Sequence, residues 1–438
     1  MVLSWGRVHR FEHQVVRLDP AKAVQQVSRG FGDAPPVLAH GLGRSYGDVA
    51  LNDRGTLLAT PRCNQFLFAD WDTGVVRAAS GLSNEELLRV CVPKGWFLPV
   101  SPGTKFVTLG GAVANDVHGK NHHHAGSFGA HVRRFALLRS DRGIVECSRD
   151  ENPDLFALTI GGLGLTGVIL WVEFQLSRIG SAFLDVENLS CDSLSDFFRL
   201  SEESKAWPYT VMWVDCFARG ASLGRGIFSR GRPRNDGNCQ PHSRKSIAWP
   251  VTTPSWLLNR ASISAFNALY RSRPGASFRG VQHYDPFFYP LDRILGWNRL
   301  YGTNGFYQHQ SLIPLRSGEA GVRGLLMRIA QAGQGSFLAV LKVHGPETSP
   351  GVMSFCREGV SLALDFANKG APTRALLASL DDIVREHGGR LYPAKDGHMS
   401  SDFFQHSYPD WPRLEAARDP KISSSFWRRV TDTPEPIA

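Results

Sequence analysis

The sequence predicts a two-domain protein of the α+β class. The chain has 438 residues, of which 42% are hydrophobic and 11% aromatic, and a single hydrophobic core stops growing at roughly 250–300 residues. The first third alternates short β-rich runs with glycine turns, whereas from about residue 180 the runs are longer and separated by loops. This change in pattern indicates two units that both contain strands and helices.

The N-terminal unit is predicted to combine short strands with amphipathic helices. Ser83, followed by Glu85 and Glu86, is typical of a helix N-cap and predicts a helix over 83–91. A second short helix is expected over 152–157. The strands, which are bounded by glycine turns, are expected at 37–39, 57–59, 75–79, 96–100, 134–139, 143–147 and 168–176.

The second unit is predicted to contain a sheet covered by helices. Residues 337–344 and 359–366 include stretches in which apolar and polar side chains alternate, which is the pattern of strands with two different faces. Further strands are expected at 209–217 and 305–313. Helices are predicted at 321–332 and at 373–387, the second ended by a glycine pair at 388–389.

Cysteines and apolar runs give expectations about the compartment. The seven cysteines are scattered without a C-x-x-C pair, so we interpret them as reduced packing residues. Residues 1–13 carry Arg7 and Arg10, which leaves no uninterrupted apolar core for a signal peptide. The richest apolar run, 165–176, is too short to span a bilayer and contains Glu173. We therefore expect no signal peptide or transmembrane helix, and a cytoplasmic protein or one held peripherally at the inner membrane.

The net charge of +9 is concentrated in one stretch. Between Arg225 and Arg279 there are ten basic residues and one acid, Asp236. Such a run can be a solvated loop, but here it alternates with apolar side chains such as Trp249, a mixture that suits an anionic membrane surface. Because no nucleic-acid motif is present, we expect a basic insertion at 225–279 that makes peripheral membrane contact, and no nucleic acid. The basic residues are Arg225, Arg230, Arg232, Arg234, Arg244, Lys245, Arg260, Arg271, Arg273 and Arg279.

Three glycine-rich segments are candidate cofactor sites. In 39–48, glycines flank a polar centre after a short strand, and their N–H groups can converge on a phosphate, although a tight turn would give the same pattern. In 101–120 so many small residues cannot form a core alone, so a flat cofactor is expected to pack there. The third, 161–167, matches G-x-G-x-x-G from Gly162, but a β-rich run at 168–172 follows where a dinucleotide-binding helix would begin.

A histidine cluster suggests zinc at first sight. The five residues are His118, His122, His123, His124 and His131. They have no clear helical i, i+4 frame because Gly119 and Gly126 interrupt the segment, and no cysteine or acid lies in register with them. We therefore predict no metal and interpret the segment as a polar loop beside a cofactor.

Six motifs in order along the chain resemble one known family. They are Gly41-Leu42-Gly43-Arg44-Ser45-Tyr46-Gly47-Asp48, His118-Gly119-Lys120-Asn121-His122, Ala125-Gly126-Ser127-Phe128-Gly129, Gly164-Leu165-Thr166-Gly167, Trp297-Asn298-Arg299-x-Tyr301-Gly302 and Ala394-Lys395-Asp396. The set resembles the decaprenylphosphoryl-β-D-ribose 2-oxidases, the flavin subunits of a lipid-linked ribose epimerase. The resemblance implies a two-lobed FAD-binding domain of the vanillyl-alcohol-oxidase (PCMH) type and a substrate domain with an antiparallel sheet.

The resemblance also implies how the chain is divided and where FAD binds. An FAD domain would be made from both chain ends, 1–180 and 390–438, with a substrate domain at 181–389. Related oxidases that bind flavin covalently often carry a histidine where this chain has Arg44, so we expect non-covalent FAD. The residues that match the family's cofactor contacts are Gly41, Leu42, Gly43, Arg44, Ser45, Tyr46, Gly47, Gly103, Thr108, Gly110, Gly111, Asn115, His118, Ile169 and Tyr392.

For the chemistry, the resemblance points to Lys395 of the Ala-Lys-Asp motif, with Tyr46 and His118 at the reacting centre. Oxidation of a hydroxyl-bearing carbon requires hydride transfer to the flavin and removal of the hydroxyl proton. A cationic Lys395 could hold an alkoxide, and a desolvated one could act as a base. The matching substrate residues are Gln308, Gln310, Lys342, Asp365 and Lys395. Ordinary polar side chains on a strand would give the same pattern for the first four.

The leading hypothesis is FAD-dependent oxidation of the 2-hydroxyl of a polyprenyl-phosphate-linked pentose to a keto sugar. This would be the first half of an epimerisation in the synthesis of a cell-envelope arabinose donor, which a separate short-chain reductase would complete. An alternative is a soluble polyol or aldonolactone oxidase that uses O2. A third hypothesis is a basic binding protein that keeps the fold without the chemistry.

Overall fold

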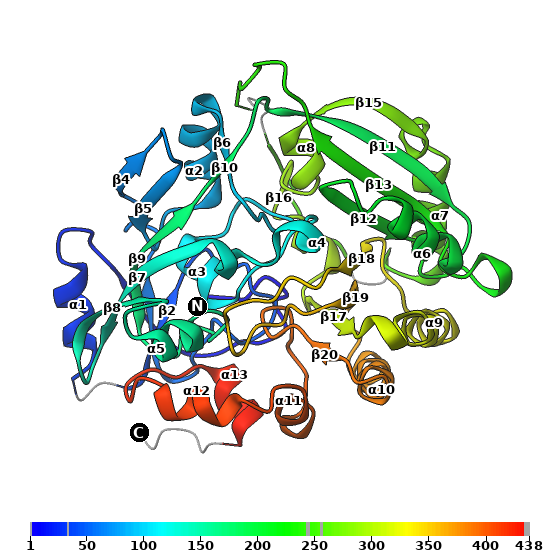
Figure 1. Ribbon diagram of the computed structural model, residues 1–438. Coiled ribbons are helices and arrows are strands. Elements are labelled where there is room, and N and C mark those ends of the chain that lie inside the picture. Colours follow the sequence, from blue (N-terminus) through cyan, green and yellow to red (C-terminus); the bar gives the residue numbers. More distant parts are fainter. Residues whose placement is uncertain (1, 33–34, 242–245, 255–256, 433–438) are drawn as a thin grey trace.

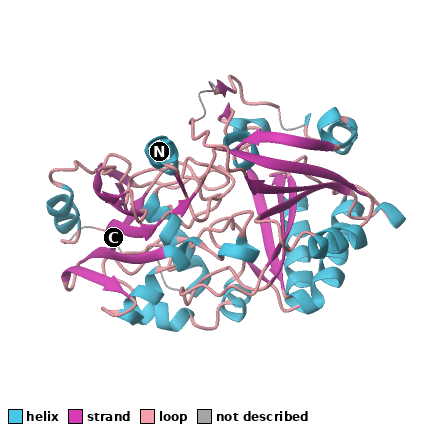
Figure 2. Ribbon diagram, turned by 45° about the horizontal axis from the view of Figure 1, so that its top comes forward, coloured by secondary structure: helices cyan, strands magenta, loops and turns pink. Residues whose placement is uncertain are grey.

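The computed structural model describes residues 2–32, 35–241, 246–254 and 257–432. Its strands form two large sheets and three small ones (Figure 1, Figure 2). In Figure 1 the N-terminal part of the chain, blue to cyan, lies beside the green and yellow strands of the second large sheet. No helix of the described residues has the length and apolar character that a membrane span requires. The fold therefore has the mixture of helices and antiparallel sheets that the sequence predicts.

Two sheets build the N-terminal half. The first is parallel, in the order β1-β3-β2, and the second is antiparallel, in the order β4-β5-β9-β7-β8. The strands are β1 (Gln14–Arg17), β2 (Val37–His40), β3 (Thr56–Ala59), β4 (Phe66–Asp70), β5 (Val75–Ala79), β7 (Val132–Arg139), β8 (Gly143–Ser148) and β9 (Val168–Gln175), and a further pair joins β6 (Trp96–Phe97) to β10 (Ser177–Arg178). The helices are α1 (Ala23–Gly30), α2 (Asn84–Cys91), α3 (Leu109–Ala114), α4 (His122–Ala125) and α5 (Pro153–Thr159).

Helices α2 and α3 differ in how far the sequence predicts them. The cap of α2 is confirmed, because the Ser83 hydroxyl accepts a hydrogen bond from the Glu86 N–H and the Glu86 carboxylate accepts one from the Ser83 N–H. Helix α3 was not predicted, since two of its six residues are glycines, each costing about 1 kcal/mol relative to alanine. It forms because the Thr108 hydroxyl caps it and its apolar side chains are buried.

An eight-stranded antiparallel sheet forms the second half. Its order is β15-β11-β13-β12-β18-β19-β17-β20. The strands are β11 (Phe183–Cys191), β12 (Tyr209–Val214), β13 (Gly226–Pro233), β15 (Phe278–His283), β17 (Phe306–Ile313), β18 (Ala339–His344), β19 (Gly359–Ala367) and β20 (Arg390–Leu391). Helices α9 (Leu315–Ala332) and α10 (Ala371–Glu386) pack against β17, and α9 also against β19, while α6 (Leu194–Glu203) contacts α9 and β11. The remaining elements of this half include α7 (Arg260–Ser272), α8 (Tyr284–Phe288) and the two-stranded sheet of β14 (Ile247–Ala248) and β16 (Ile294–Leu295).

The stretch 225–279 is not one insertion, which corrects the sequence interpretation. Its first part is β13, and its last residues begin β15, so both ends are strands of the eight-stranded sheet. Eight of its ten basic residues are described, and six of these eight form ion pairs: Arg225, Arg230, Arg232, Arg234, Arg271 and Arg279. Their partners outside the stretch are Asp185, Glu187, Asp192 and Asp215. Counting charged residues between positions 225 and 279 leaves out these acids, because they belong to other parts of the chain. Arg244 and Lys245 lie outside the described residues.

The C-terminal segment returns to the N-terminal half. The segment contains helices α11 (Ser401–Ser407), α12 (Trp411–Ala417) and α13 (Ser425–Thr431), and in Figure 1 the red helices α12 and α13 lie below the N-terminal elements. Arg429 of α13 binds two buried carboxylates, with Asp48 at 2.7 Å and Asp396 at 2.8 Å. Strand β20 pairs with β17, so the return begins at the edge of the eight-stranded sheet. The ion pairs join the end of the chain to the first glycine loop and to the segment after Lys395.

Candidate active site

A cavity of about 590 Å³ is lined by residues from both halves of the protein. Residues of the glycine segments 41–46 and 101–120 line one part, and residues 211–213 of β12 together with alternate residues of β17, β18 and β19 line another. Within β17, Gln308 and Gln310 line the cavity, whereas the intervening His309 binds Asp381 of α10 at 3.1 Å. Two-residue periodicity thus separates the cavity face of the sheet from its helix-covered face.

The first glycine loop offers an anion-binding arrangement. The backbone N–H groups of residues 42–45 have no acceptor among the described residues, and all four residues line the cavity. Gly43 has a φ of +63°, which favours glycine, and a Cβ on Gly41 would lie 2.5 Å from the Thr108 hydroxyl oxygen. Arg44 also lines the cavity, with its guanidinium 4.1 Å from the centre of the Trp5 ring. The loop can therefore hold a phosphate group.

Most predicted site residues line this cavity. They are Gly41, Leu42, Gly43, Arg44, Ser45, Tyr46, Gly103, Thr108, Gly110, Gly111, Asn115, His118, Ile169, Tyr392, Gln308, Gln310, Lys342 and Lys395. Gly47 and Asp365 are not among its lining residues. A Cβ on Gly47 would lie 1.6 Å from the carbonyl oxygen of Asp396, so this glycine permits a close backbone contact. Asp365 is completely buried behind Gln308.

Lys395 and Tyr46 lie together at the cavity wall. The Lys395 ammonium nitrogen is 3.9 Å from the centre of the Tyr46 ring. Burial lowers the pKa of Lys395, and the Asp365 carboxylate partly opposes that shift. Burial and Asp365 raise the pKa of Tyr46 well above its usual value, so the phenol keeps its proton at neutral pH. Lys395 is therefore better suited than Tyr46 to accept a proton.

Asp365 holds the neighbouring polar groups in place. Its carboxylate accepts hydrogen bonds from the Gln308 amide at 2.6 Å and from the Tyr301 hydroxyl at 3.2 Å. Burial raises the pKa of Asp365, while Gln308 and Lys395 act in the opposite direction. Asp365 therefore orients Gln308 and contributes to the electrostatic surroundings of Lys395, without lining the cavity itself.

His118 is fixed between two polar side chains. Burial and the nearby Lys342 lower the pKa of His118 well below its usual value, so the ring is neutral. Lys342 Nζ lies 2.6 Å from His118 Nδ1, and the amide nitrogen of Gln310 lies 2.9 Å from His118 Nε2. Both ring nitrogens therefore have a polar partner, which fixes the orientation of the ring.

Two further basic residues of the cavity were missed by the sequence analysis as site residues. Lys120 donates to the carbonyl of Phe287, and burial lowers its pKa to about 7. Arg273 lines the cavity, with its guanidinium 3.7 Å from the centre of the Tyr270 ring. Lys120 stands inside the His118–His122 motif, which was a usable signal. No sequence signal distinguished Arg273 from the other basic residues of 225–279.

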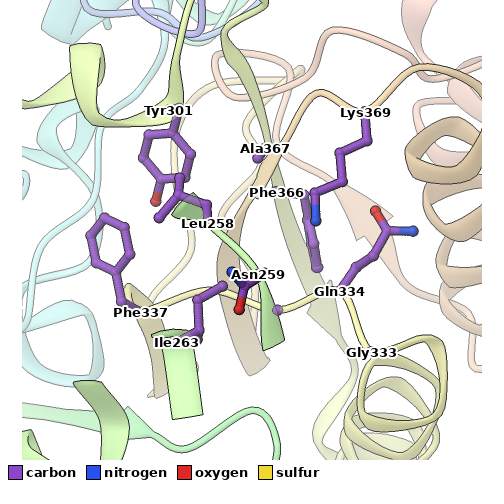
Figure 3. A pocket seen from close by; sticks show the side chains of 11 residues that line it. Leu258, Asn259, Ile263, Tyr301, Gly333, Gln334, Phe337, Phe366, Ala367 and Lys369 are labelled. Carbon is purple, nitrogen blue, oxygen red and sulfur yellow. The ribbon is translucent and has the colours of Figure 1, made fainter. Parts of the chain in front are cut away.

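A second hollow is too small to be a binding site. It lies between α7, β19 and the segment 333–337, and Figure 3 shows the side chains that line it, including Tyr301 and Phe337. Its volume is about 10 Å³, which is close to the space that one water molecule needs. The large cavity is therefore the candidate active site.

The residues present fit a bound FAD. The cavity volume falls within the roughly 300–1,000 Å³ usual for cofactor sites, and the free N–H groups of the first glycine loop suit a pyrophosphate. The side-chain oxygen of Asn115 is buried, lines the cavity and has no hydrogen-bond partner among the described residues. A buried acceptor of this kind is expected to meet a donor on a ligand.

Comparisons with known proteins agree with this fit. A family model described as an FAD binding domain matches residues 13–148. The chain is 34% identical, over 98% of its length, to the decaprenylphosphoryl-beta-D-ribose oxidase of Mycolicibacterium smegmatis, of which the match covers 97%. The chain belongs to the decaprenylphosphoryl-β-D-ribose oxidase family. As a member of this family it is an FAD-dependent oxidoreductase, and FAD is its cofactor.

Other relatives share different amounts of the chain. An uncharacterized protein of Streptomyces coelicolor is 33% identical over 78% of this chain and 98% of its own length. Mouse L-gulonolactone oxidase is 29% identical over 31% of this chain and 30% of its own length. Similarity to the decaprenylphosphoryl-β-D-ribose oxidase thus extends through both halves, whereas similarity to the lactone oxidase is confined to about a third of the chain.

Proposed function

We propose that this decaprenylphosphoryl-β-D-ribose oxidase family member oxidises the 2-hydroxyl of a polyprenyl-phosphate-linked pentose to a keto group. The observation that carries the proposal is the end-to-end similarity to a relative named for that substrate class. The cavity supports it, because one continuous space joins the FAD-binding glycine loop to Lys395 and the polar face of the eight-stranded sheet. We assign FAD binding to residues 1–180 and 390–438 and substrate binding to 181–389, and we propose that the FAD is held non-covalently.

FAD supplies the hydride acceptor when bound. Lys395 is positioned to accept the proton of the reacting hydroxyl, because burial favours its neutral amine and it lines the cavity. Tyr46, which stays protonated, can donate a hydrogen bond to an oxygen near Lys395. Asp365 positions Gln308 at the same wall. The proton removed from the hydroxyl thus moves to Lys395.

His118, Gln310 and Lys342 are proposed to orient the sugar. Because His118 is neutral and hydrogen-bonded at both ring nitrogens, it presents a fixed ring surface rather than a charge. Gln310 and Lys342 line the cavity beside it and retain further donors for sugar hydroxyls. These residues can therefore hold the ring so that one C–H faces the flavin.

The remaining wall suits an anionic lipid carrier. Arg273 supplies a cation that lines the cavity and has no carboxylate partner among the described residues, and we assign it to the phosphate of the substrate. Phe288, Leu295 and Trp213 line the same cavity and offer apolar surface for the first prenyl units. A free pentose would use neither feature.

The membrane contact proposed for 225–279 is best placed on its exposed apolar residues. Ile247, Val251 and Leu269 are 62%, 59% and 72% exposed, whereas several of the arginines are engaged in ion pairs. Changing Val251 and Leu269 to Asp should abolish binding to anionic liposomes and leave FAD bound. The matched control changes Ile144, which is 56% exposed on β8, to Asp and should keep liposome binding. Equal binding by both proteins would contradict the assignment.

Anaerobic flavin reduction tests the proposed reaction. A polyprenyl-phosphoryl ribose should bleach the flavin absorbance of the purified protein, and free ribose should not. Rapid bleaching by free polyols or aldonolactones, with peroxide formed in air, would instead favour the alternative oxidase. A flavin that no sugar reduces would favour a binding protein. The keto product still has to be reduced to give an epimer, so we propose a separate short-chain reductase as the partner.

A further inference from the structure

Three potential metal ligands meet behind the cavity, from separate parts of the chain. His122 is on α4, His344 ends β18, and Cys356 lies in the loop before β19. One ligand atom of each lies within 4.8 Å of those of the other two. The side chains are 1%, 0% and 6% exposed, and none of the three lines the FAD cavity. The cluster is therefore distinct from the catalytic wall.

The two imidazoles lack the partners that buried polar groups normally have. Both ring nitrogens of His122 and both of His344 are buried without a hydrogen-bond partner among the described residues. Their rings stack at 4.3 Å. Most buried polar side-chain atoms are hydrogen-bonded, and leaving one unpaired is costly. Four unpaired nitrogens at one place call for a ligand.

The other histidines of the sequence cluster have ordinary partners. Ring nitrogens of His123, His124 and His131 bind the backbone carbonyls of Trp207, Lys205 and Ala125. His118 binds Lys342 and Gln310. The five histidines therefore do not form one metal site. Among the described residues, His122 lies within metal-binding reach of two other potential ligands, which are more than 200 residues away in the sequence.

We propose that His122, His344 and Cys356 bind one zinc ion. Zinc bonds to nitrogen and sulfur are roughly 2.0–2.3 Å long, so the ligand atoms of a tetrahedral site are roughly 3.3–3.8 Å apart. Because the three ligand atoms here lie within 4.8 Å of one another, they have to approach by up to about 1.5 Å to bind the ion. A water molecule completes the usual tetrahedral shell. This inference does not depend on the proposed substrate.

The ligand chemistry and the local charge favour this ion. Imidazole and thiolate together select zinc over magnesium or calcium. Each histidine would bind through one neutral ring nitrogen, and the metal would displace the Cys356 proton to solvent. The ion, one thiolate and two imidazoles carry a net charge of +1, beside the buried Asp116, whose carbonyl oxygen lies 3.9 Å from the Cys356 sulfur.

A zinc ion here would cross-link separate parts of the chain next to the active site. It would join α4 of the N-terminal half to β18 of the eight-stranded sheet. The His344 ring lies 4.9 Å from that of His118, which lines the cavity. Removing the ion should therefore loosen the contact between the halves.

Metal analysis of the flavin-loaded enzyme tests the proposal. Protein purified without chelator and dialysed should contain about one zinc per flavin, and Cys356→Ser and His344→Phe should each lower this by at least about tenfold. The matched control is Cys147→Ser, a fully buried cysteine of β8, which should keep its zinc. Wild-type enzyme that stays free of zinc after incubation with zinc chloride would overturn the proposal. Undiminished zinc in both variants would also overturn it.

Two additional readouts cover variants that fold poorly. Cobalt exchanged into wild-type enzyme should give tetrahedral bands in the red, where oxidised flavin does not absorb, and their absence would count against the site. The melting temperature distinguishes a zinc site from two buried histidines that bind no metal. At a zinc site His344→Phe lowers the melting temperature of the zinc-loaded enzyme, whereas at an empty site it removes unpaired polar atoms and raises it.

Discussion

Replacing Arg429 with Met should destabilise the protein strongly, although this residue lies outside the cavity. Its guanidinium binds Asp48 and Asp396, whose side chains are 2% and 0% exposed. Removing one partner of a buried pair costs roughly 3–5 kcal/mol, because the remaining charge has no compensation. Arg429 itself is 27% exposed, which lets water relieve part of that cost. We therefore expect a loss of about 3 kcal/mol.

Urea unfolding followed by tryptophan and flavin fluorescence would measure this loss. The control is Arg413→Met, which breaks an exposed pair with Asp410 and should cost less than about 1 kcal/mol. Changing Asp48 and Asp396 to Asn in the Arg429→Met background should recover much of the stability, because no buried charge is then left unpaired. A loss below about 1 kcal/mol for Arg429→Met would refute the argument that this residue compensates the two carboxylates.

Three other changes have defined outcomes. Lys395→Met should retain FAD but slow anaerobic flavin reduction by about 10²–10⁴-fold; an unchanged rate in a stopped-flow experiment would remove Lys395 from catalysis. Burial lowers the pKa of Lys342 to about 7, so between pH 7 and 10 the unfolded chain holds a proton that the folded protein lacks, and stability rises with pH. Burial also lowers the pKa of Lys120 and Lys395, which add to this slope, so Lys342→Met should reduce the slope without abolishing it and should stabilise the apoprotein by about 2–3 kcal/mol at pH 7; a slope equal to wild type in urea titrations would contradict it. Gly47→Ala should give colourless protein, because its Cβ would lie 1.6 Å from the Asp396 carbonyl oxygen; a normal flavin spectrum would show that the backbone adapts.

Local sequence patterns predicted the elements whose own residues determine them. The capped helix α2, the alternating strand β19 and the helix α10 were predicted within a few residues. Strands β11 and β15 were missed, because their pairing depends on neighbours distant in sequence. For the same reason the charge excess of 225–279 was overestimated, since acids on other strands neutralise much of it.

The sequence motifs predicted most of the residues that line the site. The remaining residues are brought there by tertiary contacts that the sequence does not show. The family motif at 41–48 identified the first glycine loop, and the resemblance named Gln308 and Gln310 as substrate residues. Residues 41–46 and both glutamines line the cavity. No pattern separated Arg273 from its basic neighbours. The pairing of His122 with His344 and Cys356 could not be predicted either, because spacing rules apply to ligands that are close in the chain.

The return of the chain end to the first glycine loop has a consequence for biosynthesis. Arg429, which compensates Asp48 beside that loop, is synthesised 381 residues after it. When the nascent chain has left the ribosome only as far as β19, it contains the glycine loop and the other residues of the future hydride-transfer site. It still lacks Lys395 and α13. FAD is therefore expected to be captured only after α13 has left the ribosome, and a protein from which α13 is deleted should be made but should remain without flavin.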